Sequence, residues 1–178
     1  MFRHCLLLIA CAALLPVAGF AQSAPTAKPV LSPPATAEVE LNHQTITIHY
    51  STPSMRGRKI MGGLVPYGKV WRTGANPATT LITPVNLKIG TLDVPAGTYT
   101  LFTLPSENQW LFIVSKKTGE WGIPYPEGND LGRTPMTGDT LSEPQEKMSI
   151  SFEHTEGNTT QLHVKWEKTD QYVTVTAE

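Results

Sequence analysis

Cysteine is scarce in this 178-residue sequence: there are only two, Cys5 and Cys11, and none follows them. A domain formed by the rest of the chain therefore has no disulfide, no thiolate zinc site and no cysteine nucleophile. It must be held together by its apolar core, and about 140 residues are enough to bury one. Because comparable eukaryotic exported domains commonly depend on disulfides, this composition favours a bacterial envelope or secreted protein.

Helical periodicity and the common nucleotide-binding motifs are also missing. No long window repeats its apolar residues at helical spacing, and no internal repeat is visible. The sequence contains no Walker loop, dinucleotide-binding fingerprint or nucleophile elbow. The sequence therefore gives no sign of the nucleotide-binding and hydrolase classes that depend on such motifs.

The one long apolar run lies near the N-terminus, from residue 5 to residue 18, after a short polar start. Together with small residues at 19–21 it predicts a signal peptide over residues 1–21. A lipoprotein signal is the alternative, because residues 8–11 resemble a lipobox, but the apolar stretch before Cys11 is short for that role. We expect an exported protein, periplasmic or secreted, with no membrane span after cleavage.

Residues 22–36 contain four prolines, which indicates a linker before a single domain over residues 37–178. In this domain, apolar and polar residues alternate at period two. The alternating or extended stretches are 38–42, 45–50, 79–89, 98–104, 109–115, 148–153, 162–167 and 173–175. About eight strands predict an all-β fold, a two-sheet antiparallel sandwich or jelly roll with long loops over 53–80 and 116–145.

Turn signals set the expected connections between these strands. Asn42-His43 predicts a hairpin, and further turns are expected at residues 156–158 and at Thr169-Asp170. Pro84 interrupts an extended stretch and predicts an edge strand or a bulge there. Glycines and prolines over residues 116–145 predict that this whole segment is irregular.

Charge is distributed unevenly along the chain. Residues 41–92 carry six basic side chains and no acidic one, whereas residues 93–178 carry six basic and thirteen acidic ones. Two interpretations remain open: the two regions pack together and neutralise each other, or the basic region forms a surface that attracts anions. A nucleic-acid partner is not expected, because the chain as a whole is not basic.

The loop over residues 53–80 concentrates the chemistry that an anion or a polar ring requires. Guanidinium groups bind carboxylates and phosphates through paired hydrogen bonds, and aromatic rings stack on sugars or cations. The candidate ligand-binding residues are Arg56, Arg58, Lys59, Tyr67, Lys69, Trp71, Arg72 and Asn76, joined by Trp121 from the second loop. The alternative is a structural role, in which Trp71 plugs the end of the sandwich and the arginines pair with acids.

Carboxylates in the second loop offer a catalytic alternative. Glu120, Glu127 and Asp130 are weak candidates for the acid and base of a hydrolase, if they face the basic loop across a cleft. The alternative is that these acidic residues lie in a solvated loop and have no catalytic role. A calcium site is not expected, because the spacing of Glu127, Asn129 and Asp130 differs from that of an EF-hand loop.

The positions of the histidine residues do not predict a metal site. His49 and His163 fall on the polar faces of their strands, and His154 lies near the end of another strand. No pair has the close spacing of a local metal site, so surface histidines are expected and no metal site or cofactor is predicted.

Several strings in this chain resemble the DUF2911 family of exported bacterial domains of unknown function. The strings are YSTPS at 50–54, RGRKI at 56–60, LVPYGKVWRTGAN at 64–76 and PAGTY at 95–99. The resemblance extends from about residue 32 to the C-terminus. It implies an exported, β-rich domain, but it carries no activity and no assigned site.

Three functional hypotheses follow from the sequence. The first is a non-enzymatic module that binds an anionic or carbohydrate-like small ligand through residues 53–80. The second is a hydrolase that uses the carboxylates of residues 116–145 across the same cleft. The third is a structural or interaction protein of the cell envelope. The sequence does not indicate an oligomeric state.

Overall fold

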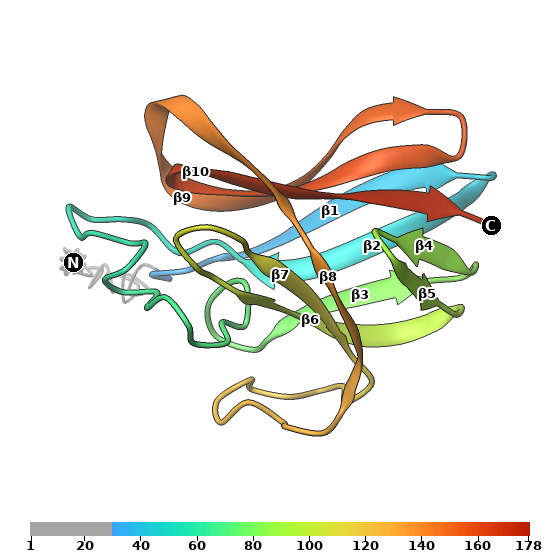
Figure 1. Cartoon of the computed structure of the whole chain (residues 1–178), viewed down its shortest axis with the longest axis horizontal. Coiled ribbons are helices and arrows are strands. Elements are labelled where there is room, and N and C mark those ends of the chain that lie inside the picture. The colour runs from blue at the N-terminus through green and yellow to red at the C-terminus, as the bar shows by residue number, and fades with distance from the viewer. Residues whose placement is uncertain (1–29) are drawn as a thin grey trace, which may run out of the picture.

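The computed structural model describes residues 30–178 as two antiparallel β-sheets packed face to face (Figure 1). The predicted signal peptide and residues 22–29 of the predicted linker lie outside these described residues. Between residues 30 and 178, no helix is long and apolar enough to cross a membrane. The prediction of an all-β, two-sheet sandwich is confirmed, and the sheets do not close into a barrel.

The larger sheet has six strands in the order β1-β2-β3-β6-β7-β8. Its strands are β1 (Pro34–Leu41), β2 (Gln44–Ser51), β3 (Thr79–Thr83), β6 (Gly97–Leu104), β7 (Leu111–Ser115) and β8 (Asp130–Pro135). The hairpin between β1 and β2 turns at Asn42 and His43, as predicted, and both residues have positive φ. β1 begins three residues before the expected start of the domain, because Pro34 pairs with Ser51.

The smaller sheet has the order β5-β4-β10-β9 and covers the apolar face of the first. Its strands are β4 (Leu87–Ile89), β5 (Leu92–Val94), β9 (Thr137–Glu156) and β10 (Thr159–Ala177). The alternation predicted for residues 148–152 and 162–166 is observed, since Met148, Ile150 and Trp166 are buried.

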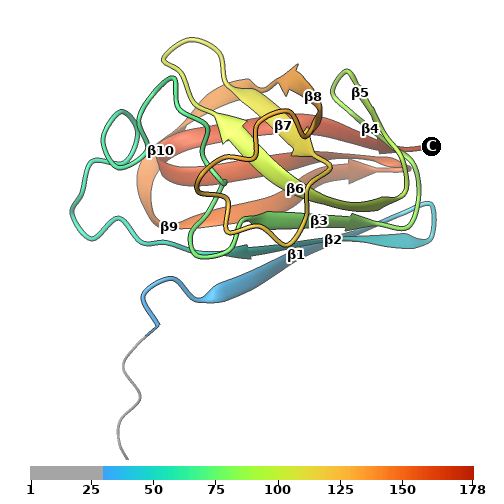
Figure 2. The ribbon, with the colours of Figure 1, turned by 90° about the horizontal axis from the view of Figure 1, so that it is seen from below.

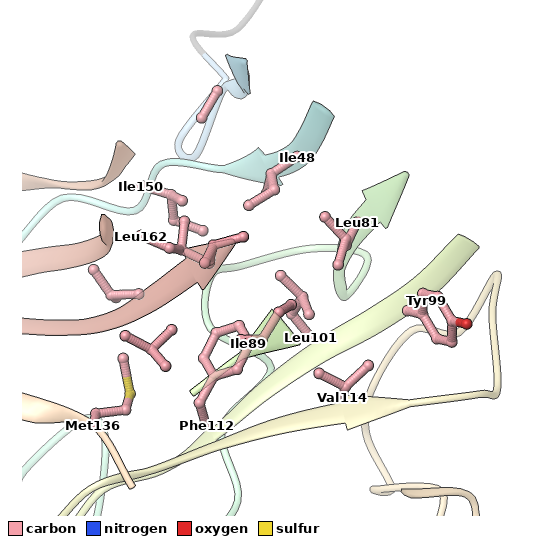
Figure 3. Close-up of a cluster of buried hydrophobic side chains, with 14 of the residues drawn as sticks. Ile48, Leu81, Ile89, Tyr99, Leu101, Phe112, Val114, Met136, Ile150 and Leu162 are labelled. Carbon is pink, nitrogen blue, oxygen red and sulfur yellow. The ribbon is translucent and has the colours of Figure 1, made fainter. Parts of the chain in front are cut away.

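The core lies between the two sheets and is almost entirely aliphatic and aromatic. Figure 3 shows Ile48, Leu81 and Leu101 of the six-stranded sheet facing Ile150 and Leu162 of the smaller one. These side chains are at most 4% exposed, so their burial is the main stabilising contribution in a domain without disulfides.

The structure corrects three predictions of secondary structure. Ten strands are present among the described residues instead of about eight: β5 and β8 were not predicted, the stretch 79–89 divides into β3 and β4, and the stretches 162–167 and 173–175 together form β10. Pro84 marks neither an edge nor a bulge: the chain crosses there from β3 in one sheet to β4 in the other. The segment 116–145 is irregular only as far as residue 129, because β8 and the first part of β9 tolerate their prolines at an edge and beside bulges.

The long β10 folds back on itself, as the turn predicted between the stretches 162–167 and 173–175 implies. The Ala177 amide donates to the Asn158 carbonyl, and the hydroxyls of Thr159 and Thr176 lie 3.1 Å apart. The reversal occurs around Glu167, whose φ is 56°, beside register shifts in the pairing with β9. The predicted turn is therefore present, but it lies about two residues before Thr169-Asp170, both of which are paired with β9.

Candidate functional site

The basic segment between β2 and β3 is ordered by backbone hydrogen bonds to both sheets. Trp71 exchanges two backbone hydrogen bonds with Thr103 of β6, and Ser54 forms a bridge with Lys147 of β9. The segment therefore closes one end of the sandwich, remote from the C-terminus (Figures 1 and 2). Because the segment is hydrogen-bonded to the sheets near both of its ends, its side chains are held in place without a helix or a strand.

Acidic residues of β9 and β10 do contact this segment, but through its backbone and not through its cations. The Glu146 carboxylate accepts from the Arg56 amide at 2.9 Å. The Glu167 carboxylate accepts from the amides of Ile60 and Met61 at 3.4 and 3.1 Å. The predicted packing of the acidic and basic regions is thus partly right, yet it leaves the positive side chains unneutralised.

None of the five basic side chains between residues 53 and 80 forms a salt bridge with a carboxylate of residues 30–178. Arg58 donates instead to the backbone carbonyls of Ser54 and Met55 at 2.7 and 2.9 Å. Arg72 donates to the Trp121 carbonyl at 3.0 Å, and its guanidinium lies 5.2 Å from the centre of the Trp121 ring. Burial lowers the pKa of Arg72 from its ordinary value, but an arginine remains charged in proteins.

Arg58 and Arg72 line the same pocket, which has a volume of about 330 Å³. Most of its other walls are apolar side chains. The full lining within the described chain is Ser32, Pro53, Arg58, Leu64, Val65, Val70, Trp71, Arg72, Gly74, Ala75, Ile123 and Trp166. This lining has two positive charges and no acidic residue, so the pocket favours a negatively charged ligand.

Trp71 is part of the core as well as a wall of the pocket. Its ring stacks on Trp166 with centroids 5.9 Å apart, and it meets Trp110 edge-on at 6.5 Å. Its indole N–H donates to the Gly74 carbonyl. One face of the ring is therefore already covered, and the structural role that the sequence left open for Trp71 is present.

The remaining candidates of this segment lie around the pocket and do not line it. Arg56 is exposed and donates to the Leu31 carbonyl, while Lys59 and Lys69 are exposed to solvent. Tyr67 is 38% exposed and packs over Gly62, where a Cβ would come within 2.9 Å of its ring. Asn76 binds the Ser32 carbonyl at 2.9 Å, so its amide fastens the segment before β1.

The second loop contributes apolar groups to the mouth of the pocket. Figure 2 shows residues 116–129 lying over the outer face of the six-stranded sheet. The loop is joined to the basic segment by the Arg72–Trp121 contact and by the Ala78 amide, which donates to the Glu120 carbonyl. Trp121 and Ile123 are 56% and 67% exposed, and Ile123 lines the pocket.

The carboxylates of the second loop are engaged elsewhere. Glu120 lies 3.6 Å from Lys117, and Glu127 is exposed. Asp130 accepts hydrogen bonds from the Tyr125 hydroxyl and, at 2.7 Å, from Arg133. Burial and the neighbouring Asp130 raise the pKa of Tyr125 to about 12, so this phenol stays protonated at neutral pH. Among the described residues, none of these three carboxylates lines the pocket. The geometry therefore gives the hydrolase hypothesis no support.

Replacing Tyr125 with phenylalanine should loosen the second loop without changing the core. The ring packs edge-on against Phe102 at 5.0 Å, and phenylalanine would keep that contact. The lost hydrogen bonds to Asp130 and Arg133 should lower the free energy of unfolding by about 1–2 kcal/mol, measured by urea denaturation. A loss below about 0.5 kcal/mol would show that these bonds do not hold the loop.

Sequence reasoning missed the apolar half of the pocket. Leu64, Val65, Val70 and Ile123 lie in irregular segments, so no periodicity marks them as lining residues. Their only sequence signal is large apolar side chains in loops that are rich in glycine and basic residues. Trp166 also reaches the pocket, although its alternation predicted a core residue alone.

Comparisons with known proteins gave one finding. A family model described as "Protein of unknown function (DUF2911)" matches residues 32–175, which include both sheets and every wall of the pocket. No curated protein and no solved structure matched the chain.

Proposed function

Since the chain belongs to the DUF2911 family, a family of unknown function, we propose a function from the site itself. We propose that the protein is a binding module for a small amphipathic anion, held in the pocket between residues 53–80 and the 121–123 segment. The ligand class is a carboxylate or phosphate joined to an apolar group.

One observation carries this proposal: Arg58 and Arg72 line an apolar pocket whose described lining contains no acidic residue. Both guanidinium groups are held by backbone carbonyls, so their orientation is fixed without neutralising their charge. Each guanidinium still has donor groups free for a carboxylate or phosphate, because it has five N–H donors.

The apolar walls define the rest of the ligand. Leu64, Val65, Val70 and Ile123 would be in contact with a hydrocarbon or aromatic group, and the pocket volume lies at the small end of the range for ligand sites. A sugar stacked on Trp71 is less well supported than an amphipathic anion, since the Trp71 ring is already stacked on Trp166. The predicted export would place this site in the periplasm or outside the cell, and we retain export as part of the proposal.

Thermal-shift and calorimetric screening of small anions tests the proposal. We expect aryl and alkyl carboxylates or phosphates to raise the melting temperature, because a ligand that binds only the folded state stabilises it. The matched amides and alcohols, which lack the charge, should bind at least about tenfold more weakly, a difference of about 1.4 kcal/mol.

Arg72→Gln supplies the matching variant, with Lys69→Gln as its control. Arg72 lines the pocket, whereas Lys69 is an exposed cation of the same segment that does not. Loss of a charge-assisted contact should weaken anion binding by about 1.5–3 kcal/mol in Arg72→Gln and by little in Lys69→Gln. Equal binding by both variants and the wild type, or equal binding of charged and neutral compounds, would contradict the proposed site.

A further inference from the structure

A second cluster of functional side chains lies on β9 and β10, outside the pocket. Glu153, His154 and His163 each offer one ligand atom, and these atoms all lie within 4.8 Å of one another. We propose that this cluster is a binding site for a divalent transition-metal ion, with zinc as the probe. The site shares no residue with the lining of the anion pocket, so the inference is independent of the proposed function.

An irregularity in strand pairing brings the three side chains together. Gln161 pairs with Glu153 and Thr159 pairs with Glu156, so β9 has one more residue than β10 between these pairs. His154 lies in this bulge with a φ of 53°, a left-handed conformation that is unfavourable for histidine. A β-bulge redirects side chains, and here it holds the His154 ring 6.1 Å from that of His163.

His163 was expected on the surface, but the structure buries it. It is 4% exposed, because β10 folds back and stacks Tyr172 on the imidazole with centroids 4.8 Å apart. The buried Asp170 lies 2.8 Å from Nδ1 of His163. A carboxylate accepts hydrogen bonds and does not donate them, so Nδ1 carries the proton and donates it to Asp170.

This arrangement leaves Nε2 as the available ligand atom of a neutral His163. Metal-binding histidines typically donate their other ring N–H to a carboxylate, which fixes the tautomer and the ring orientation. Nε2 lies 3.2 Å from the side-chain oxygen of Gln161, another acceptor. A cation bound between these two acceptors would be in contact with both of them.

Lys165 is the competing cation at this site. Its ammonium group lies 2.6 and 2.8 Å from the two Glu153 oxygens and 3.5 Å from Asp170. A metal ion on Glu153 would displace the ammonium toward Asp170, which it already approaches. Removing the Lys165 charge should therefore strengthen metal binding, an effect that a merely structural cluster would not produce.

The ligand set selects the class of metal. Two imidazoles and one carboxylate suit zinc, copper and nickel, whereas calcium and magnesium prefer oxygen ligands alone. Zinc ligands about 2.0–2.1 Å from the ion are about 3.4 Å apart in a tetrahedron, so ligand atoms within 4.8 Å of one another must approach by up to about 1.4 Å. His154 is exposed and can make this movement, and it gives the ion access from solvent.

Calorimetric titration of the untagged full chain with zinc tests the inference, using His154→Ala and His49→Ala as a matched pair. Both histidines are exposed, but His49 lies on β2 and is not part of the cluster. We expect zinc binding to weaken about tenfold or more in His154→Ala and to be unchanged in His49→Ala. We expect Lys165→Gln to bind zinc more tightly than the wild type.

Equal zinc affinity in the wild type and His154→Ala would overturn the inference, whatever sites other parts of the chain provide. Zinc binding that is weakened as much by His49→Ala as by His154→Ala would overturn it as well. The absence of any zinc binding would overturn it too. Anion binding in the pocket should be the same in all of these variants, so failure of either proposal is recognised separately.

Discussion

Trp71→Ala should lower the free energy of unfolding by about 3–4 kcal/mol, measured by urea denaturation. The Trp71 ring stacks on Trp166 and touches Trp110, so its removal leaves a cavity at the end of the core. The indole N–H that donates to Gly74 is lost as well. Because the same ring forms a wall of the pocket, anion binding should also weaken.

Trp71→Phe separates packing from hydrogen bonding in this prediction. Phenylalanine keeps an aromatic ring near Trp166 but has no donor for the Gly74 carbonyl. We expect Trp71→Phe to lower the free energy of unfolding by roughly half as much as Trp71→Ala, because the destabilisation caused by a large-to-small core substitution scales with the volume lost. A Trp71→Ala protein as stable as the wild type but unable to bind anions would instead make Trp71 purely a ligand platform.

Glu167→Ala should destabilise the domain by about 2–4 kcal/mol, although Glu167 is only half-buried. Its carboxylate accepts from the amides of Ile60 and Met61, whose side chains are buried. Without it, these two donors lose a charged partner and the basic segment loses its attachment to β10. Urea denaturation measures the stability, and proteolysis between residues 53 and 80 should become faster in the variant.

Glu167→Gly is the control for backbone strain. Glu167 has a φ of 56°, which glycine adopts without the cost of about 1–2 kcal/mol that other residues incur. Glycine should therefore be less destabilising than alanine by about that amount, while both lack the carboxylate. If glycine restored full stability, strain relief would outweigh the hydrogen bonds and the proposed attachment would be wrong.

Several strands that the sequence predicted have one buried and one exposed face, whereas β6 and β7 are buried along most of their length. Residues 45–50 and 162–167 alternate because every second side chain enters the core, and this requirement is local. β5 has three residues, too few for a period to be visible, and the equally short β4 was not separated from β3 in the stretch predicted over residues 79–89. β8 and the start of β9 contain glycines and prolines that ordinarily end strands, and only their pairing partners make them strands.

The candidate site was likewise predicted only in part. Composition drew attention to residues 53–80, and Arg58, Trp71 and Arg72 do line one pocket. The apolar walls and Ile123 were not predictable, because their meeting depends on how two loops pack. The sequence also did not predict that Glu146 and Glu167 bind backbone amides and leave the arginines without carboxylate partners.

The histidines show most clearly which contacts the sequence pattern could not predict. A period-two pattern places His163 on the outer face of its strand, and this part of the prediction is right. Its burial follows from the reversal of β10 at Glu167, which brings Asp170 and Tyr172 over the ring. Contacts across a reversal of this kind depend on bulges and backbone dihedrals that alternation does not encode.

The sequence by itself determined the all-β class, the two-sheet sandwich, the family and the segment on which basic and aromatic residues gather. It could do so because these properties depend on composition, local alternation and a long specific string. Only the tertiary structure decided which cations line a pocket, which acids are engaged with backbone amides and which histidines face each other. Those relations join residues that are distant in the chain, and the packing of loops and bulges brings them together.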